Sequence, residues 1–388
     1  MRLSEEALML KDIAKRFAKE ELMPLEDELD RTNDLPPETW KKLIKKAIEV
    51  GLWQCMIPKE YGGGGVNWTN AIGIWEEIAA VSCVFERMLL SNPGVEIMGY
   101  NLATQDQMDR FFLPLMRGEK LMFHALTEPD AGSDTTMLKT KAVKKGDQWI
   151  INGTKRFISI APRADFGIVF AITDPGKPAR EGTSVFFVEK GTPGFKIERT
   201  PEYMGSHGML SSELVFEDCA VPETNLLGSV NGAYREVMRM MGGARILTSS
   251  CSLGIAKRSL KIATDYSLSR ITWGKPIAAR QYIQGMLVDS ATEIYASECM
   301  LYDTAAEADN GNEDPKLQAM CKLFITEMSC HVCDRMIQVC GGVGYTKDMV
   351  LEKLYRDSRV LRMGDGTSEI QKLIIASRLV GRKYAFDF

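Results

Sequence analysis

The chain has 388 residues, of which 45% are hydrophobic and 26% are charged, and its formal net charge is −4 at pH 7. This length favours two or three folding units with large cores. No basic excess supports nucleic-acid binding, and no run of about 18 apolar residues predicts a transmembrane helix. We therefore expect small-molecule chemistry, with no nucleic-acid or membrane partner.

The N-terminal segment and the cysteines indicate the compartment. Residues 4–8 (SEEAL) are polar and then amphipathic, unlike the apolar core of a signal peptide, so we expect no cleaved leader. Nine scattered cysteines do not resemble a disulfide framework, and we expect reduced thiols in the cytoplasm. Cys330 and Cys333 have the spacing of a metal or redox motif, but no second Cys or His pair accompanies them, so we predict no metal there.

Residues 1–122 have the pattern of α-helices. Apolar residues recur with the i, i+3, i+4 spacing of one helix face at Leu10, Ile13, Ala14, Phe17 and Ala18. The segment 57–65 (IPKEYGGGG) must be a loop, because glycines destabilise a helix and Pro58 lacks an amide donor. We predict an N-terminal helical domain.

Residues 123–226 change to short strand patterns. Segments 148–151 (QWII) and 156–159 (RFIS) flank Asn152-Gly153, which we interpret as a hairpin turn. Further strand-like runs occupy residues 166–171, 183–188 and 213–216. We predict a middle domain made of β-strands.

Residues 227–388 return to long helical patterns. Breaks occur near residues 274–276, 310–312, 341–344 and 364–366. Long helices without heptads favour an antiparallel bundle. The chain contains neither the glycine pattern of a Rossmann site after a first strand nor that of a P-loop. The order of the three segments is therefore α, β, α.

Several motifs occur in the order found in the acyl-CoA dehydrogenase family. They are residues 127–134 (TEPDAGSD), 270–277 (RITWGKPI) followed by Gln281, 338–345 (QVCGGVGY), and 355–357 (YRD) followed by 366–371 (GTSEIQ). Alone, each is typical of a polar turn or a solvated helix end. Together they span nearly the whole chain, which on this resemblance is identified as a member of the family.

The resemblance implies an α+β fold. Its expected parts are an N-terminal helical domain (1–122), a middle β-barrel or sandwich domain (123–226) and a C-terminal four-helix bundle (227–388). It also implies a homotetramer with FAD between the β domain and the bundle, a coenzyme A thioester as substrate, and an electron-transfer flavoprotein as electron acceptor.

The same resemblance assigns residues to the flavin. By position, Leu126, Thr127 and Ser133 lie beside the isoalloxazine or the thioester arm, and Phe157 and Ser159 pack against the ring. Hydroxyls and backbone donors polarise a flavin, and an aromatic wall excludes water. A core aromatic in a strand is the alternative interpretation of Phe157, which stands where a tryptophan is common. Further residues assigned to the cofactor are Thr272, Thr367 and Glu369.

Other residues are assigned to the FAD of a neighbouring subunit. Arg270 and Gln281 are expected at its pyrophosphate or adenosine half, because a guanidinium donates to a diphosphate in a fixed fork. Gln338, Gly341 and Gly342 are expected to meet it across the interface, where glycine permits close backbone approach. The alternative for Arg270 is a solvated charge at a helix end.

Asp365 stands where family dehydrogenases carry the glutamate that removes the proton α to the thioester carbonyl. Without the resemblance, residues 364–366 are a turn, and Ser368 with Gln371 forms a capping box. Some relatives carry the base just before the position of Arg245, but that residue here is Ala244. Asp365 is therefore our candidate catalytic base.

An aspartate base suggests an unusual acyl group. Its carboxylate is displaced by about 1.5 Å relative to glutamate, and a misplacement near 1 Å can cost roughly 10²-fold in rate. Gly364 replaces a large aromatic common in the family, and residues 242–244 are small. We therefore predict room for a bulky, α-branched or alicyclic acyl group such as cyclohexanecarboxyl.

The expected substrate contacts are Ser133, Arg245, Gly364 and Gly366. Arg245 matches an arginine near the bound thioester arm, although Gly242 replaces the aspartate usual before it. In the expected mechanism, Asp365 removes the α proton while a hydride leaves the β carbon for flavin N5. A ribityl hydroxyl and the backbone N–H of Asp365 hold the thioester oxygen.

Other functions stay open at this point. A nitroalkane-oxidase-like flavoenzyme also uses an aspartate, but Lys372 stands where such enzymes have an arginine. An enoyl-CoA reductase would run the same half-reaction in reverse, and a non-enzymatic scaffold would only bind CoA esters. We assign no chemistry to His124, His207 and His331, which lack ligand spacing.

Overall fold

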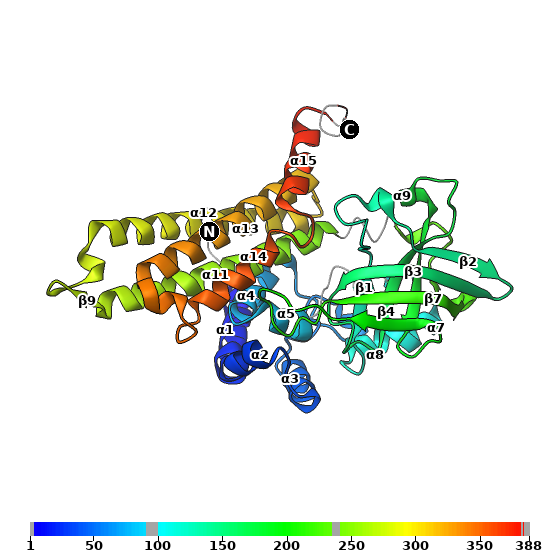
Figure 1. The fold of residues 1–388 in the computed structure, drawn as a ribbon, viewed down its shortest axis with the longest axis horizontal. Coiled ribbons are helices and arrows are strands. Elements are labelled where there is room, and N and C mark those ends of the chain that lie inside the picture. Colours follow the sequence, from blue (N-terminus) through cyan, green and yellow to red (C-terminus); the bar gives the residue numbers. More distant parts are fainter. Residues whose placement is uncertain (1–3, 91–99, 235–240, 382, 384–388) are drawn as a thin grey trace.

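The computed structural model describes residues 4–90, 100–234, 241–381 and 383 (Figure 1). Its N-terminal part is helical, with α1 (Glu5–Phe17), α2 (Glu26–Thr32), α3 (Pro37–Glu49), α4 (Trp68–Ala79), α5 (Cys83–Leu89), α7 (Gln105–Gln107) and α8 (Leu113–Met116). The side chain of Ser4 caps α1 by accepting from the N–H of Ala7 at 3.0 Å. The predicted break at 57–65 is a loop with one 3-10 turn, Lys59–Tyr61.

The middle part is a mixed sheet. Its strands are β1 (Met122–Ala125), β2 (Lys141–Lys145), β3 (Gln148–Ile158), β4 (Phe166–Ile172), β5 (Thr183–Glu189), β6 (Phe195–Arg199), β7 (Ser212–Pro222) and β8 (Leu226–Leu227). They are ordered β6-β7-β3-β2-β4-β5-β8, and β1 pairs in parallel with β4. Separate apolar clusters cover the two faces of β4, which explains its almost unbroken run of buried residues.

The predicted hairpin turn at Asn152-Gly153 is wrong. β3 continues through both residues, and its register against β7 shifts between Ile151 and Gly153. Asn152 accepts from the N–H of Asp218 on β7 at 2.8 Å, so its amide stabilises an irregularity inside the sheet. The β2–β3 connection lies a few residues earlier, where Lys145 pairs with Gln148.

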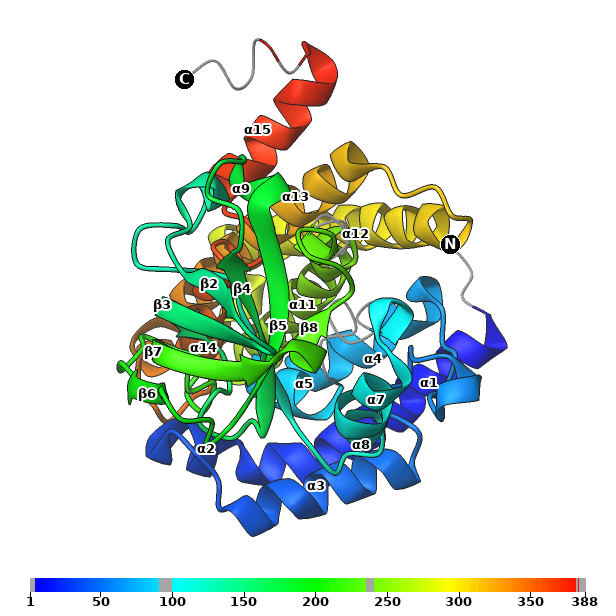
Figure 2. The ribbon, with the colours of Figure 1, turned by 90° about the vertical axis from the view of Figure 1, so that its right-hand side faces the viewer.

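The C-terminal part is a helical bundle with α11 (Met241–Ser269), α12 (Gln281–Asp309), α13 (Pro315–Cys340) and α14 (Leu351–Leu361), followed by α15 (Ser368–Leu379). A hairpin of β9 (Ile271–Thr272) and β10 (Lys275–Pro276) joins α11 to α12. Figure 2 shows α1 to α3 and the bundle helices α12 and α13 on opposite sides of the molecule, with α15 projecting outward. These parts confirm the predicted α+β class; the boundaries 1–122, 123–226 and 227–388 remain a prediction.

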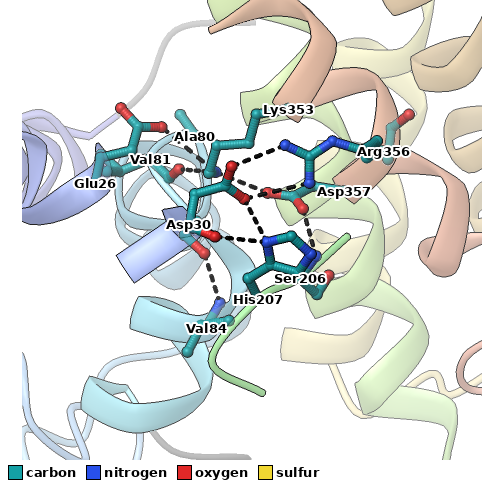
Figure 3. Close-up of polar contacts among 12 residues, drawn as sticks. Glu26, Asp30, Ala80, Val81, Val84, Ser206, His207, Lys353, Arg356 and Asp357 are labelled. Atoms are coloured by element: carbon teal, nitrogen blue, oxygen red, sulfur yellow. Dashed lines mark hydrogen bonds and ion pairs between the residues drawn. The ribbon is translucent and has the colours of Figure 1, made fainter. Parts of the chain in front are cut away.

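A largely buried group of ionisable side chains joins all three parts (Figure 3). This junction cluster consists of Glu26 and Asp30 on α2, His207 on the segment before β7, and Lys353, Arg356 and Asp357 on α14. Lys353 Nζ donates to Asp357 at 2.7 Å, and Arg356 donates to Asp30 at 2.9 Å. The ring nitrogens of His207 contact the carbonyl oxygens of Asp30 and Tyr203, at 2.7 and 3.1 Å. Paired charges of this kind hold domains in one arrangement.

Candidate active site

Asp365 lies in the short connection between α14 and α15. Its backbone is left-handed, with φ 53°, and its side chain is half-buried. Gln371 Nε2 donates to the carbonyl oxygens of Asp365 and Gly366 at 3.1 and 2.8 Å. Two successive backbone carbonyls are thus held from the following helix, which fixes the backbone of the connection at Asp365.

The predicted capping box is wrong by one residue. Thr367 caps α15 and accepts from the N–H of Ile370 at 3.3 Å. Ser368 instead donates to Glu327 on α13 at 2.6 Å, and Gln371 turns back to the Asp365 connection. The side chain of Ser368 is therefore used in a contact with a distant helix, and Thr367 caps α15 in its place.

The carboxylate of Asp365 faces α11 and α13. Thr248 Oγ1, on α11, donates to Asp365 Oδ2 at 2.5 Å. Lys322, on α13, is fully buried and donates to the carbonyl of Gly366 at 2.9 Å. Burial lowers the pKa of Lys322 to about 8, with Asp365 opposing the shift and Arg245 adding to it. We call Arg245, Thr248, Lys322 and Asp365 the base site.

Arg245 contributes a second cation to the base site. Burial lowers its pKa, and the charge of Asp365 opposes that shift. Within the described part of the chain, its buried Nε has no hydrogen-bond partner. Because a buried donor without a partner is costly, this atom is expected to meet a ligand.

A loop after β1 carries Leu126, Thr127 and Ser133. A buried ion pair holds it: Lys155 Nζ contacts Glu128 at 2.7 Å and donates to the carbonyl of Leu126 at 2.9 Å. Burial lowers the pKa of Lys155 to about 8 against the effect of Glu128. Burial alone would raise the pKa of Glu128, but Lys155 outweighs it and the pKa is lowered. Ser133 is exposed and Leu126 and Thr127 are half-buried, so this edge is accessible to a ligand.

Phe157 is not a core residue. It lies at a second register shift between β3 and β7, with φ 59° and 51% of its side chain exposed. Arg156 places its guanidinium 4.9 Å from the ring centroid, and Ser159 Oγ lies 3.2 Å from Ser211 Oγ. The core interpretation of Phe157 is therefore wrong. An exposed ring beside hydroxyls fits a flat cofactor with a polar edge, as the predicted flavin has.

The remaining predicted cofactor residues fall into two places. Thr367 and Glu369 lie at the start of α15, near Asp365. Residues at the far end of the bundle, around β9 and β10, are Arg270, Thr272, Gln281, Gln338, Gly341 and Gly342. In Figure 1 this end lies farthest from the sheet. Except for half-buried Thr272, these far-end residues are exposed, and a side chain at Gly341 or Gly342 would meet no atom within 4 Å. The exposed position of Arg270 fits both interpretations of that residue.

The predicted space beside residues 242–244 is filled. A Cβ at Gly242 would lie 2.5 Å from Gln318 Oε1, and one at Gly243 would lie 2.3 Å from the ring of Trp68. The glycines therefore accommodate these two side chains. Gly364 differs, because it is exposed and the nearest atom to its Cβ position is the carbonyl oxygen of Val360 at 3.9 Å. Gly366, with φ 91°, adopts a conformation that favours glycine.

Sequence reasoning missed Thr248, Lys322 and Lys155. Thr248 follows Arg245 by one turn on the same helix, a spacing that could have identified it. Lys322 lies far away in the sequence and carries no local signal. His124, assigned no chemistry, packs edge-on against Phe170 and is uncharged at neutral pH, because burial lowers its pKa to about 3.

The sequence predicts no metal site at Cys330 and Cys333 and no transmembrane helix. Cys330 and Cys333 are buried on α13, where Cys330 Sγ contacts Ser358 O and Cys333 Sγ contacts Ser259 Oγ, at 3.4 and 3.3 Å. Among the described residues, no His, Cys, Asp and Glu side chains form a group of three or more that could hold a metal ion. Within the same residues, every helix is too short or too polar to cross a membrane.

Comparisons with known proteins agree with this architecture. Residues 4–119, 124–219 and 233–380 match the N-terminal, middle and C-terminal domain models of acyl-CoA dehydrogenase. The chain is 38% identical to acryloyl-CoA reductase (NADH) of Anaerotignum propionicum, over 98% of this chain and 96% of that protein. It is 34% identical to subunit CarC of the caffeyl-CoA reductase–Etf complex of Acetobacterium woodii, over 98% of this chain and 100% of that protein.

A solved structure, butyryl-CoA dehydrogenase from Megasphaera elsdenii, is similar with a TM-score of 0.90 and 30% identity, over 98% of this chain and 99% of that one. The chain therefore belongs to the acyl-CoA dehydrogenase family, whose members carry FAD, and it is an oxidoreductase that acts on acyl-CoA.

Proposed function

We propose that this enzyme forms the α,β double bond of an acyl-CoA thioester, with Asp365 as the base that removes the α proton. The observation that carries the proposal is the placement of Asp365. Its half-buried carboxylate lies on a fixed connection, accepts a hydrogen bond from Thr248, and interacts electrostatically with Arg245, whose Nε has no partner among the described residues. A general base needs this combination of access and fixed direction.

Each residue of the base site has a proposed role in the mechanism. Asp365 takes the α proton on its carboxylate. Its backbone N–H makes no hydrogen bond within the described chain, so it is available to the thioester oxygen, where enolate charge develops. Arg245 donates to polar groups of the CoA arm. FAD, when bound, supplies the acceptor for the hydride of the β carbon. Phe157, Leu126 and Thr127 form the wall that excludes water from the reacting carbons.

We further propose that the acyl group is wide and lies beside Gly364. The open space at Gly364 supports this, whereas Gln318 and Trp68 fill the side of Gly242 and Gly243. The experiment mixes the yellow protein anaerobically with butyryl-CoA, a branched acyl-CoA and cyclohexanecarboxyl-CoA, and follows the flavin absorbance. We expect the cyclic thioester to bleach the flavin fastest. Preference for the straight chain contradicts a wide pocket and leaves the dehydrogenase assignment intact.

A second candidate is the reverse reaction, reduction of an enoyl-CoA. The observation that favours it is the similarity to relatives named acryloyl-CoA reductase and caffeyl-CoA reductase. The same base site serves both directions, because Asp365 would return the α proton. Photoreduced protein mixed anaerobically with enoyl-CoA gives the rate of flavin reoxidation, and oxidised protein mixed anaerobically with acyl-CoA gives the rate of bleaching. A faster reoxidation by enoyl-CoA than bleaching by acyl-CoA favours the reductase.

The nitroalkane-oxidase alternative has its own test. Peroxide formed from a nitroalkane in air would support it.

We propose an electron-transfer flavoprotein as the redox partner, since one relative is a subunit of a complex with Etf. We also propose a cytoplasmic location, which the nine free thiols support. For the redox partner, reduction of the recombinant flavoprotein by the enzyme and acyl-CoA is the test. Electron transfer to NAD⁺ or oxygen alone would contradict it.

We propose a homotetramer in which a neighbouring subunit completes each FAD site. Large exposed side chains surround the far-end cofactor residues and continue along α12, including Trp273 at 90% and Tyr282 at 91% exposure. Such patches mark protein interfaces. Native mass spectrometry of the holoenzyme should show four chains and four FAD, and the Trp273→Ala, Tyr282→Ala variant should lose both. A monomer with full FAD content contradicts this assembly.

A further inference from the structure

We infer that Thr248 is a positioning residue for Asp365, holding one carboxylate oxygen and leaving the other for the proton. The inference rests on the proposed function of Asp365 as the base. Thr248 is buried on α11, and its Oγ1 donates to Asp365 Oδ2 at 2.5 Å. Within the described part of the chain, this is the one hydrogen bond that the carboxylate accepts. Oδ1 is therefore the oxygen assigned to the α proton.

Thr248 differs from every other serine and threonine on its helix. Serine and threonine inside helices commonly donate to a carbonyl of the preceding turn. On α11 the residues that do so are Ser249, Ser250, Ser252, Ser259, Thr264, Ser267 and Ser269. Thr248 instead donates across the domain to the Asp365 connection. Its hydroxyl serves the base site and not the helix.

The other contacts near Asp365 do not perform this task. Gln371 holds the carbonyls of Asp365 and Gly366, and Lys322 holds the carbonyl of Gly366. These bonds fix the backbone but leave rotation of the aspartate side chain free. Thr248 removes that freedom, and branching at Cβ limits its own side chain to few χ1 rotamers in a helix. Catalysis is sensitive to errors near 1 Å, so this restraint affects the rate of proton removal.

The test compares Thr248→Val, which keeps the shape and removes the hydroxyl, with Thr248→Ser, which keeps the hydroxyl. The readout is exchange of the α hydrogen of cyclohexanecarboxyl-CoA for solvent deuterium, measured by mass spectrometry with FAD-loaded protein. We expect exchange to fall about 10-fold to 100-fold in Thr248→Val and less than about 3-fold in Thr248→Ser. FAD content, melting temperature and the dissociation constant for cyclohexanecarboxyl-CoA should stay unchanged in both variants.

Ser250→Ala is the matched control, because Ser250 is also buried on α11 but donates to its own helix, at Ile246 O. Exchange in this variant should equal that of the parent. An equal loss in Ser250→Ala and Thr248→Val shows a general effect of hydroxyl removal and overturns the inference. Equal exchange in Thr248→Val and the parent also overturns it.

A change at Asp365 itself separates the inference from the proposed function. Exchange that persists in Asp365→Asn removes Asp365 from the mechanism, and the role of Thr248 falls with it. Asp365→Glu moves the carboxylate by about 1.5 Å, so Thr248→Val should cost less than about 3-fold in that background. An undiminished cost there indicates a structural role for Thr248 and overturns the inference while leaving the base assignment in place.

Discussion

The junction cluster and the base site both bury cations, but their cations are paired differently. In the junction cluster, burial would lower the pKa of Lys353, yet Asp357 and Glu26 outweigh it and the pKa is raised. In the base site, burial dominates and the pKa of Lys322 falls to about 8, because the hydrogen bond that its Nζ donates among the described residues goes to a neutral carbonyl. The difference teaches that the lysine of the junction cluster is paired with carboxylates within the described chain, whereas the base site leaves the Nε of Arg245 without a hydrogen-bond partner there.

The largest expected effect comes from removing the carboxylate of Asp365 from the base site. Asp365→Asn keeps the size of the side chain and removes its basicity, so flavin reduction by acyl-CoA should slow by about 10³-fold or more. FAD binding and the melting temperature should be retained, because the backbone contacts of Asp365 persist. Anaerobic stopped-flow absorbance measures the rate. A reduction rate within a factor of ten of the parent contradicts Asp365 as the base.

The next effect breaks the junction cluster. Lys353→Met leaves Asp357 buried without its cation, while Glu26 keeps its pair with Arg258, and the change should cost about 3 kcal/mol of unfolding free energy. Urea unfolding followed by circular dichroism measures it. Lys261→Met, which breaks an exposed ion pair with Asp265, is the matched control and should cost less than about 1 kcal/mol. Equal costs in the two variants would show that the junction cluster does not depend on its pairing.

A smaller effect is expected on the affinity for acyl-CoA when Arg245, the second cation of the base site, is replaced. Arg245→Met removes a cation whose Nε lacks a partner within the described chain, so stability should not fall. The dissociation constant for acyl-CoA should rise about 10-fold to 100-fold, because a charge-assisted bond to the ligand is lost. Calorimetric titration and a thermal melt test both parts. Unchanged affinity with a lowered melting temperature assigns Arg245 a structural role instead.

The smallest effect concerns pH. The pKa of Lys322 is about 8 in the folded chain and 10.5 as an ordinary lysine, so the unfolded chain binds more protons between these values. The contribution of Lys322 to the free energy of unfolding therefore rises with pH between about 8 and 10.5. Below pH about 8, the full cost of burying the charged lysine remains. The pKa of Lys155 is lowered to about the same value, about 8, so Lys155 contributes over the same pH range. The test is therefore the difference in free energy of unfolding between the parent and Lys322→Met. That difference should favour the variant most below pH about 8, and a pH-independent difference contradicts the lowered pKa of Lys322.

Local patterns were sufficient to predict part of this protein. The order α, β, α follows from hydrophobic spacing, and the breaks at 57–65 and 364–366 follow from glycine and proline. Residues 127–134 and 366–371 are contiguous motifs, which the comparisons place within matching family domains. These features depend on neighbouring residues in the chain, and this is why sequence alone determined them.

Other features depend on atoms that the fold brings together from distant segments. Asn152-Gly153 has the composition of a hairpin turn, yet pairing with β7 keeps it inside a strand. Gly242 suggests open volume until Gln318 is seen to occupy it, and Thr248 becomes significant only when Asp365 is placed against it. Sequence therefore determined the fold class, the family and the candidate base. Tertiary structure decided which charges are paired, which spaces are filled and which hydroxyl holds the carboxylate, because those properties arise from contacts between helices far apart in the chain.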